Sequence, residues 1–360
     1  MKQKGKIKVM VGYAVRWLLP LALTVLLVWY MFRKVDFREM WHIVSHGVDY
    51  WWILAAMGIS VVSHIMRALR WRIQLRGLGI DPPLMAVVCS IFGTYALNLV
   101  FPRLGEVWRC TYIANREHAP FTTVVGSMVA DRVADVIMVG LLTLLTFVVA
   151  APALEAFLVK YPIGRGLVDA ATNYKVWLVV LAVVLVVWGV FHFLRDTRIV
   201  SKIRSWIGQM WSGFAVVTRM KGKWGFLFFS IAIWTCYFFQ LYVAFFAFPF
   251  TRALVSEPGT VAGMVPCLVA FVLSSIGMAV PSNGGLGPWN IAVMFGLAVY
   301  GISDAQGTAF SMLQWSGQTV MLIILGILTM GYIAIDRRGE RPLKEEIEEM
   351  ETEMSSTPID

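Results

Sequence analysis

The segment Asn98–Arg109 reads NLVFPRLGEVWR and decides how this chain of 360 residues is organised. It continues the apolar stretch Leu84–Phe101, yet it contains a proline, a glycine and three charged side chains. Such a sequence is too polar for contact with lipid, and irregular backbone at membrane depth persists only where protein or water satisfies it. We therefore predict a re-entrant hairpin here, which enters a membrane and returns to the same side.

The composition of the whole chain supports a membrane location. Hydrophobic residues make up 58% and charged residues only 15% of the sequence, against about 25% charged in an ordinary soluble domain. Apolar runs of roughly 20 residues, the length that crosses a bilayer, recur between Leu18 and Ile335. The sequence therefore predicts an all-α integral membrane protein.

The charges of the loops on either side give a second reason to predict the hairpin. The loops that follow Arg67 and Arg195 are both rich in Lys and Arg, which places both in the cytoplasm. Three full crossings cannot connect two points on the same side of a membrane, so one of the three apolar stretches between these loops must return. The three stretches are Leu84–Phe101, Phe121–Ala151 and Tyr174–Leu194.

The same parity problem recurs in the second half of the chain. There the break reads PSNGGLGP at Pro281–Pro288, the most turn-prone stretch of the sequence. We predict a second hairpin over Val261–Tyr300 that enters from the outside. Each half, about residues 15–151 and 174–335, then reads span, span, hairpin, span in opposite orientations, an inverted repeat typical of transporters.

The predicted membrane domain covers residues 1–335, and residues 336–360 form an acidic cytoplasmic tail. The tail contains nine acidic and four basic residues, a net charge of −5 within a chain of net charge +9. The basic excess lies in the N-terminal segment and in short loops, where it faces lipid phosphate rather than nucleic acid. We expect a multi-pass protein of the cytoplasmic (inner) membrane with both termini in the cytoplasm.

The first break carries the candidate residues for an anionic ligand. A helix that restarts after Pro102 presents free N–H groups and a positive dipole end, and arginine supplies forked donors for phosphate oxygens. A structural alternative is that Arg103 reaches lipid headgroups while Glu106 pairs with Arg109. The candidate ligand-binding residues of this segment are Asn98, Arg103, Gly105, Glu106 and Arg109.

Three charged residues lie inside the fourth apolar segment. Asp131 and Asp135 share a helix face, and Arg132 can reach Asp135 at a spacing of three residues. They either neutralise the arginines of the hairpin, shuttle a proton, or form a purely structural ion-pair network. Charge inside a membrane is costly and usually purposeful, so we include all three as candidates.

The second break supplies backbone rather than side-chain chemistry. Glycine N–H groups in a turn can cradle a phosphate or pyrophosphate, although a tight bend alone also explains them. Interhelical hydrogen bonding is the ordinary explanation for the neutral polar residues nearby, Gln314 and Gln318. The candidate ligand-binding residues of this break are Asn283, Gly284, Gly285, Gly287 and Asn290.

Other conspicuous residues receive structural interpretations. Arg67, Arg70 and Arg72 with Trp71 resemble a basic and aromatic anchor at the membrane interface, with direct gripping of a headgroup as the alternative. His64 lies within a span, where we expect it to be packed. The four cysteines show no metal or disulfide spacing and are expected to be buried.

In order and spacing, four motifs together resemble the lysylphosphatidylglycerol synthase transmembrane-region family, whose members are also called flippase-like domain proteins. The resemblance covers about residues 15–335. The motifs are Arg67-x-x-Arg70-Trp71, Asn98-x-x-x-Pro102-Arg103-x-Gly105-Glu106-x-x-Arg109, Asp131-Arg132-Val-Ala-Asp135 and Pro281-x-x-Gly284-Gly285-x-Gly287.

The resemblance implies a role in moving a lipid, such as an aminoacylated phospholipid or a polyprenyl-linked sugar, between leaflets. Family members that synthesise such lipids add a soluble aminoacyl-transfer domain, for which this chain leaves no room after its last span. Asn290 and Gln314 stand where the family pattern leads us to expect an acidic and a basic residue. The second half is therefore expected to work differently or to recognise another headgroup.

The leading hypothesis is a flippase-like translocase for a phospholipid or a polyprenyl-linked lipid with an anionic headgroup. The alternatives are a membrane-embedded transferase or hydrolase that acts on a lipid-linked sugar, with Glu106 or Asp131 as base, and an accessory subunit of a lipid-modifying system. No catalytic residue, cofactor or metal is expected of a translocase. Membrane lipids are the expected partners, a lipid-linked sugar among them; a separate synthase or a second copy of the chain stays open, and nucleic acid is not expected.

Overall fold

The apolar stretches form helices, and a computed structural model describes residues 37–101, 103–152, 155, 174, 178, 222–280 and 282–335. Within these ranges the regular structure is helical throughout, with no strand. The helices are α2 (Phe37–His46), α3 (Tyr50–Gly77), α4 (Leu84–Val100), α5 (Leu104–Arg116), α6 (Phe121–Val149), α11 (Lys223–Phe245), α12 (Pro249–Ser256), α13 (Met264–Gly277), the short 3₁₀ helix η1 (Asn283–Gly285), α14 (Pro288–Ala298) and α15 (Asp304–Ile335).

Four of the described helices are long and apolar enough to cross a bilayer, namely α3, α6, α11 and α15. The chain is an all-helical, multi-pass membrane protein, as the sequence predicts. The first predicted span, nearly all of the span predicted over 174–194, and the acidic tail lie outside the described residues.

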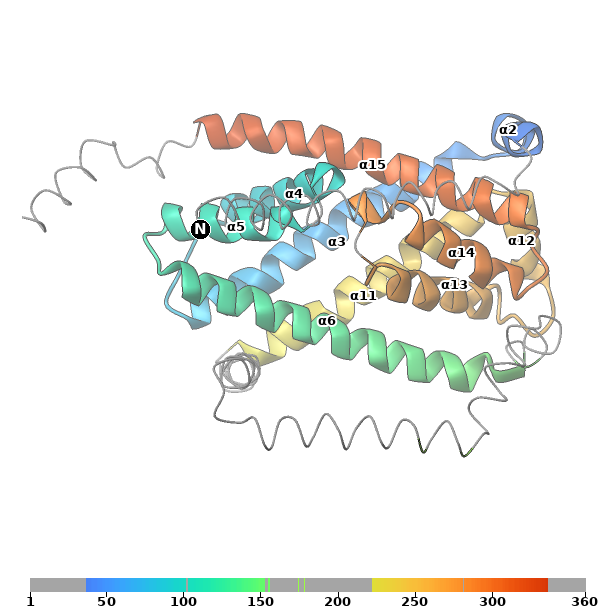
Figure 1. Cartoon of the computed structure of the whole chain (residues 1–360), viewed down its shortest axis with the longest axis horizontal. Coiled ribbons are helices and arrows are strands. Elements are labelled where there is room, and N and C mark those ends of the chain that lie inside the picture. The colour runs from blue at the N-terminus through green and yellow to red at the C-terminus, as the bar shows by residue number, and fades with distance from the viewer. Residues whose placement is uncertain are drawn as a thin grey trace, which may run out of the picture.

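Helices α3 and α11 form the central pair of the fold and run side by side through the molecule (Figure 1). They are antiparallel, because the Asp49 N–H at the start of α3 donates to the Ala247 carbonyl just beyond the end of α11, at 2.9 Å. At the other end, a Cβ on Gly222 would lie 2.6 Å from Ile73 Cγ2, so the absent side chain allows close approach. Helices α6 and α15 flank this pair on opposite sides (Figure 1).

Helices α4 and α5 form the first predicted hairpin. They are shorter than the four spanning helices and pack against each other in antiparallel fashion. The approach is so close that a Cβ on Gly105 would lie 2.1 Å from the Thr94 carbonyl oxygen. Asn98 Oδ1 accepts a hydrogen bond from the Gly105 N–H at 2.9 Å, which satisfies one donor in the first turn of α5.

Helices α13 and α14 form the second predicted hairpin at the other end of the molecule (Figure 1). Small residues again set the approach, since a Cβ on Gly296 would lie 2.5 Å from Ala270 Cα and one on Gly277 would lie 2.8 Å from the Pro288 carbonyl oxygen. Both predicted hairpins are therefore pairs of short, tightly packed helices.

The tips of the two hairpins meet between α3 and α15. Asn283 Nδ2 donates to the Val100 carbonyl oxygen at 3.0 Å, and Leu99 lies against Gly284. Trp315 of α15 holds the second tip in place, because its Nε1 donates to the Gly284 carbonyl oxygen at 2.9 Å. The two breaks thus lie against each other in the fold.

The order of the described elements occurs twice along the chain: spanning helix, hairpin, spanning helix, as α3, α4–α5, α6 and again as α11, α13–α14, α15. This agrees with two similar halves. The opposite orientation of the halves in a membrane remains a prediction.

Candidate functional site

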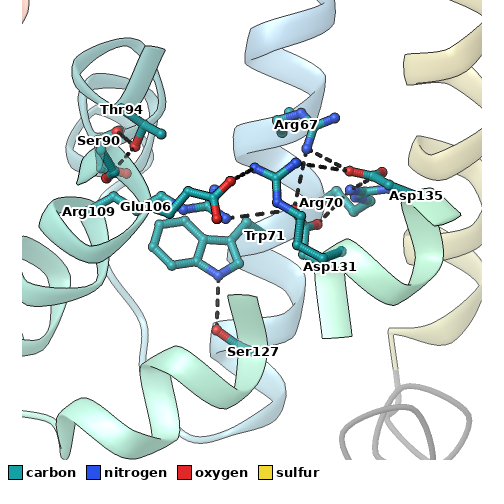
Figure 2. A network of polar contacts seen from close by, with 12 residues as sticks. Arg67, Arg70, Trp71, Ser90, Thr94, Glu106, Arg109, Ser127, Asp131 and Asp135 are labelled. Carbon is teal, nitrogen blue, oxygen red and sulfur yellow. Dashed lines mark hydrogen bonds and ion pairs between the residues drawn. The ribbon is translucent and has the colours of Figure 1, made fainter. Parts of the chain in front are cut away.

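Helix α3 continues to Gly77, past Arg67, where the sequence predicts the start of a cytoplasmic loop, and this changes the place of its arginines. Arg67 and Arg70 are 3% and 0% exposed, and Trp71 is fully buried. The prediction of an interfacial anchor is wrong for these residues, because they face the carboxylates of α6 inside the protein (Figure 2).

Arg72, which belongs to the same predicted anchor, lies with Arg76 nearer the surface at the end of α3, with side chains 22% and 51% exposed. Arg72 and Arg76 contact Asp81 in the loop before α4, at 3.2 Å and 2.7 Å. The hydrogen bond from Arg76 lowers the pKa of the exposed Asp81 carboxyl below its usual value.

Asp135 of α6 is held from two sides by α3. Its Oδ2 accepts a hydrogen bond from Arg67 Nη1 at 2.9 Å, and its Oδ1 accepts one from Arg70 Nη2 at 2.8 Å. Arg132 also reaches it at 3.7 Å, at the spacing of three residues predicted from the sequence. Helix α11 fixes the two arginines of α3, since Tyr237 Oη accepts from Arg67 Nε at 3.2 Å and Ser230 Oγ accepts from Arg70 Nη1 at 3.3 Å.

Asp131, one turn earlier on the same face, lies among three arginines. Arg70 Nη2 is 2.7 Å from Oδ1, Arg67 Nη1 is 3.5 Å from Oδ2 and Arg109 Nη2 is 3.9 Å from Oδ2. Yet neither Asp131 oxygen accepts a hydrogen bond of good geometry from the described residues. Asp131 is therefore ion-paired without being fully satisfied.

Arg109 of α5 is the least compensated cation of the group. Only 1% of the residue is exposed, and its guanidinium lies 4.6 Å from the centre of the Trp71 ring. Trp71 is itself fixed, because its Nε1 donates to Ser127 Oγ at 2.9 Å (Figure 2). Arg109 Nε and Nη2 donate to no acceptor among the described residues.

The predicted pair between Glu106 and Arg109 is not the one that forms. Glu106 makes its ion pair with Arg132 of α6, which reaches across from the neighbouring helix. Both side chains are partly exposed, at 23% and 38%, so they form the outer edge of the site. Glu106 therefore does not neutralise Arg109.

We call these seven residues the charged cluster. It joins α3, α5 and α6 and contains four guanidinium groups but only three carboxylates, which leaves one excess positive charge at low exposure. A buried charge without a full complement of partners is costly, and such groups mark functional sites more often than structural ones. The residues of the charged cluster are Arg67, Arg70, Glu106, Arg109, Asp131, Arg132 and Asp135.

The remaining candidates of the first break lie at its tip. Arg103 has a left-handed backbone with φ 63° and is exposed. Its Nη2 donates to the Ala279 carbonyl oxygen of the second hairpin at 3.3 Å. Asn98 and Gly105 are used within the hairpin, so the structure separates tip residues from those of the charged cluster.

The candidates of the second break form its turn. Gly284, Gly285 and Gly287 all have positive φ, at 57°, 80° and 92°, which explains why glycine is needed there. The Gly287 N–H donates to Asn290 Oδ1 at 3.1 Å, so this donor is occupied. Asn290 is fully buried, and its Nδ2 has no partner among the described residues.

Among the neutral polar residues of the interior, Gln318 bonds between helices as expected, whereas Gln314 Oε1 has no partner among the described residues. Gln240 Nε2 of α11 donates to Gln318 Oε1 at 2.9 Å, and Gln318 Nε2 lies 3.4 Å from His64 Nε2 of α3. His64 is buried beside Phe92 and Tyr95.

The four cysteines are free, and three of them are buried. No group of His, Cys, Asp or Glu in the described ranges could hold a metal ion.

Sequence reasoning missed the place of Arg67 and Arg70 in the site, although a signal exists. Polar residues recur along α3 at Ser60, Ser63, His64, Arg67, Arg70 and Gln74, at spacings of mostly three or four, and all are buried. That periodicity marks one polar face on an otherwise apolar helix. A polar face of this kind needs a partner inside the protein.

Comparison with known proteins finds a family and a relative of this chain. Residues 17–326 match the family model described as "Lysylphosphatidylglycerol synthase TM region". The chain is also 31% identical over 121 residues to "Glycosyltransferase AglD" of Haloferax volcanii, a match that covers 33% of this chain and 19% of that protein. The match therefore spans about a fifth of the length of this relative. No solved structure matches.

Proposed function

Because the chain belongs to the lysylphosphatidylglycerol synthase TM region family, we propose that it is a translocase that moves a lipid with an anionic headgroup between the leaflets of the membrane. The observation that carries the proposal is the unsatisfied side of the charged cluster. There Arg109 presents Nε and Nη2 without acceptors, and Asp131 presents two oxygens without good donors.

The unsatisfied donors of Arg109 suit a phosphate in charge and geometry. Guanidinium N–H groups form charge-assisted, two-pronged hydrogen bonds with phosphate oxygens, and the cluster has one positive charge in excess. Asp131 is an acceptor that can take a further hydrogen bond, for example from a hydroxyl or ammonium group. The headgroup that we infer therefore combines a phosphate with a hydroxyl or an amine.

The hairpin tips supply the second part of the proposed site. Arg103 is exposed at the contact between the tips and can meet a phosphate near the surface of the cluster. The turn Asn283–Gly287 has backbone N–H groups that can approach a ligand closely because three of its residues are glycine. We propose that these groups guide the headgroup, while Arg109 binds it.

Movement of the headgroup requires the tips to separate, because Arg109 is only 1% exposed in the described state. Two polar contacts between described residues join the tips, from Arg103 to the Ala279 carbonyl and from Asn283 to the Val100 carbonyl. Rocking of one hairpin against the other around a fixed site is how many transporters with repeated halves alternate access. The charged cluster is the fixed site in this scheme.

A lipid-linked sugar is the alternative cargo. The name of AglD, a glycosyltransferase, favours it, although the match covers a third of the present chain. A sugar that is linked to the membrane through a phosphate would use the same arginine and the same acidic acceptor.

The proposal is tested by equilibrium binding in nanodiscs, with phosphatidylglycerol and zwitterionic phosphatidylcholine as probes. The wild type should prefer phosphatidylglycerol. Replacing Arg109 by Met should weaken that binding roughly 10- to 150-fold, the equivalent of one charge-assisted contact. Arg109→Lys should restore it only partly, because an ammonium group keeps the charge without the fork.

The matched control is Arg72→Met, which removes an arginine of α3 that contacts Asp81 outside the charged cluster. It should leave the lipid preference unchanged. Wild-type preference for phosphatidylglycerol in a folded Arg109→Met protein would refute the proposed headgroup site.

A further inference from the structure

One face of α6 changes from charged to apolar along its length. Asp131 and Asp135 of the charged cluster occupy its first part. The same face continues at spacings of three and four residues with Met138, Leu142, Leu145 and Val149. Residues at these spacings lie in one row on a helix. The charged cluster and the apolar row are therefore continuous.

The apolar row forms one wall of an open groove between α6, α11 and α13, with a volume of about 390 Å³. This size lies within the range of small-molecule pockets. From Met138 to Val149 the groove extends about 16 Å at 1.5 Å per residue, roughly half of the ~30 Å hydrocarbon core of a bilayer. The remaining walls are Ile231, Trp234, Thr235, Phe238, Val261, Met264, Val265 and Leu268.

Trp234 is the unusual member of the lining. It is 8% exposed, and its indole N–H has no acceptor among the described residues. It lies at the end of the groove next to the charged cluster, since Ser230, one turn away on α11, bonds to Arg70. This N–H is buried beside the groove; an unsatisfied buried donor is costly, and a ligand whose acceptor reaches it removes the cost.

We propose that the groove binds an ester-linked acyl chain of a glycerophospholipid, whose ester carbonyl accepts the hydrogen bond from Trp234 Nε1. The inference rests on the proposed function and specifies the tail of the lipid whose headgroup lies at the charged cluster. In a glycerophospholipid an ester carbonyl follows the phosphate by a few bonds, and Trp234 lies one helical turn beyond Ser230, which bonds to Arg70 of the charged cluster. A polyprenyl chain has no acceptor beyond its phosphate and would leave the indole unpaired.

The first experiment compares ester-linked and ether-linked phosphatidylglycerol with matched chains, because the ether form lacks the carbonyl. Each competes with a phosphatidylglycerol that carries a photoreactive acyl chain, bound to the full chain in nanodiscs of ether-linked phosphatidylcholine. The ester form should bind roughly 2- to 13-fold more tightly, the range for one neutral hydrogen bond. Trp234→Phe should abolish this difference by weakening the ester form only.

The second experiment fills the groove. Leu142→Trp adds bulk to the lining and should reduce photo-cross-linking to the groove residues. The matched control is Leu144→Trp, on the same helix but 66% exposed and outside the groove lining. The control should leave cross-linking at the wild-type level.

Equal binding of the ester and ether forms to the wild type would overturn the inference, as would tighter binding of a polyprenyl phosphate than of either. A uniform loss in Trp234→Phe would mean that the indole serves packing only, and would overturn it as well. The proposed function is judged separately with glycerophosphoglycerol, a headgroup without tails. If glycerophosphoglycerol competes in the wild type but not in Arg109→Met, the proposed headgroup site is supported even when the inference about the groove is refuted.

Discussion

Replacing Arg70 and Arg109 by methionine, one at a time, should separate the stabilising part of the charged cluster from its binding part. The two residues are a matched pair, because both are arginines of the same cluster with exposures of 0% and 1%. Methionine fills most of the vacated volume without charge. The contacts of the two arginines differ sharply, and so should the consequences.

Arg70 holds both carboxylates of α6. Its Nη2 lies 2.7 Å from Asp131 Oδ1 and 2.8 Å from Asp135 Oδ1. Its loss leaves two buried carboxylates with one cation fewer, and removing one partner of a buried ion pair typically costs about 3–5 kcal/mol. We expect Arg70→Met to lower the free energy of unfolding by that amount.

Arg109 makes one long ion pair, 3.9 Å to Asp131, and stacks on Trp71. The stacking contributes about 0.5–2 kcal/mol. Against that loss, methionine removes the excess positive charge from a buried site, which relieves an uncompensated desolvation cost. The two effects oppose each other, so Arg109→Met should change the stability by less than about 2 kcal/mol.

The assay is reversible unfolding in mixed micelles, followed by helical circular dichroism. Arg70→Met should unfold at clearly lower denaturant than the wild type, and Arg109→Met close to it. Equal destabilisation by the two substitutions would refute the reasoning, because it would mean that Arg109 is as fully paired as Arg70. A greater loss in Arg109→Met would refute it more strongly.

Two further predictions concern the hairpin and the topology. Gly105→Ala places a Cβ against the Thr94 carbonyl and should lower the free energy of unfolding by at least about 1–3 kcal/mol. The control Gly126→Ala on α6 meets open space and should be neutral or slightly stabilising. Equal unfolding free energies of the two variants would contradict the tight hairpin. In a background without the native cysteines, Thr122→Cys should react with an impermeant reagent from the cytoplasm and Ser256→Cys from the opposite side; labelling of both from one side would contradict the inverted halves.

The sequence allows the hairpins to be predicted because any two loops lie either on the same side of the membrane or on opposite sides. Once two basic loops lie on one side, an odd number of apolar stretches between them requires one to return. The breaks at Pro102 and Gly284 then identify which one returns. Helical pairs form at both places in the structure, and their tips are in contact.

The composition of the site could be predicted less completely. Arg67 and Arg70 stand where an apolar run ends, and charge at that place serves equally well as an interfacial anchor or as the start of a buried polar face. The choice depends on whether a carboxylate on another helix faces them, here Asp135, and sequence spacing does not reveal partners on different helices. For the same reason Glu106 pairs with Arg132 of α6 rather than with its own helix neighbour.

The most direct test of the central claim is leaflet-resolved transport in proteoliposomes. Fluorescent phosphatidylglycerol and phosphatidylcholine are followed by impermeant quenching of the outer leaflet, with the wild type, Arg109→Met, and a Val100→Cys/Asn283→Cys protein whose tips are joined by a cleavable thiol cross-linker. We predict that the wild type moves phosphatidylglycerol in preference, that Arg109→Met does not, and that cross-linked tips stop transport until the linker is cleaved. Undiminished transport by Arg109→Met or by the cross-linked protein, or no transport of either lipid by the wild type, would contradict the account.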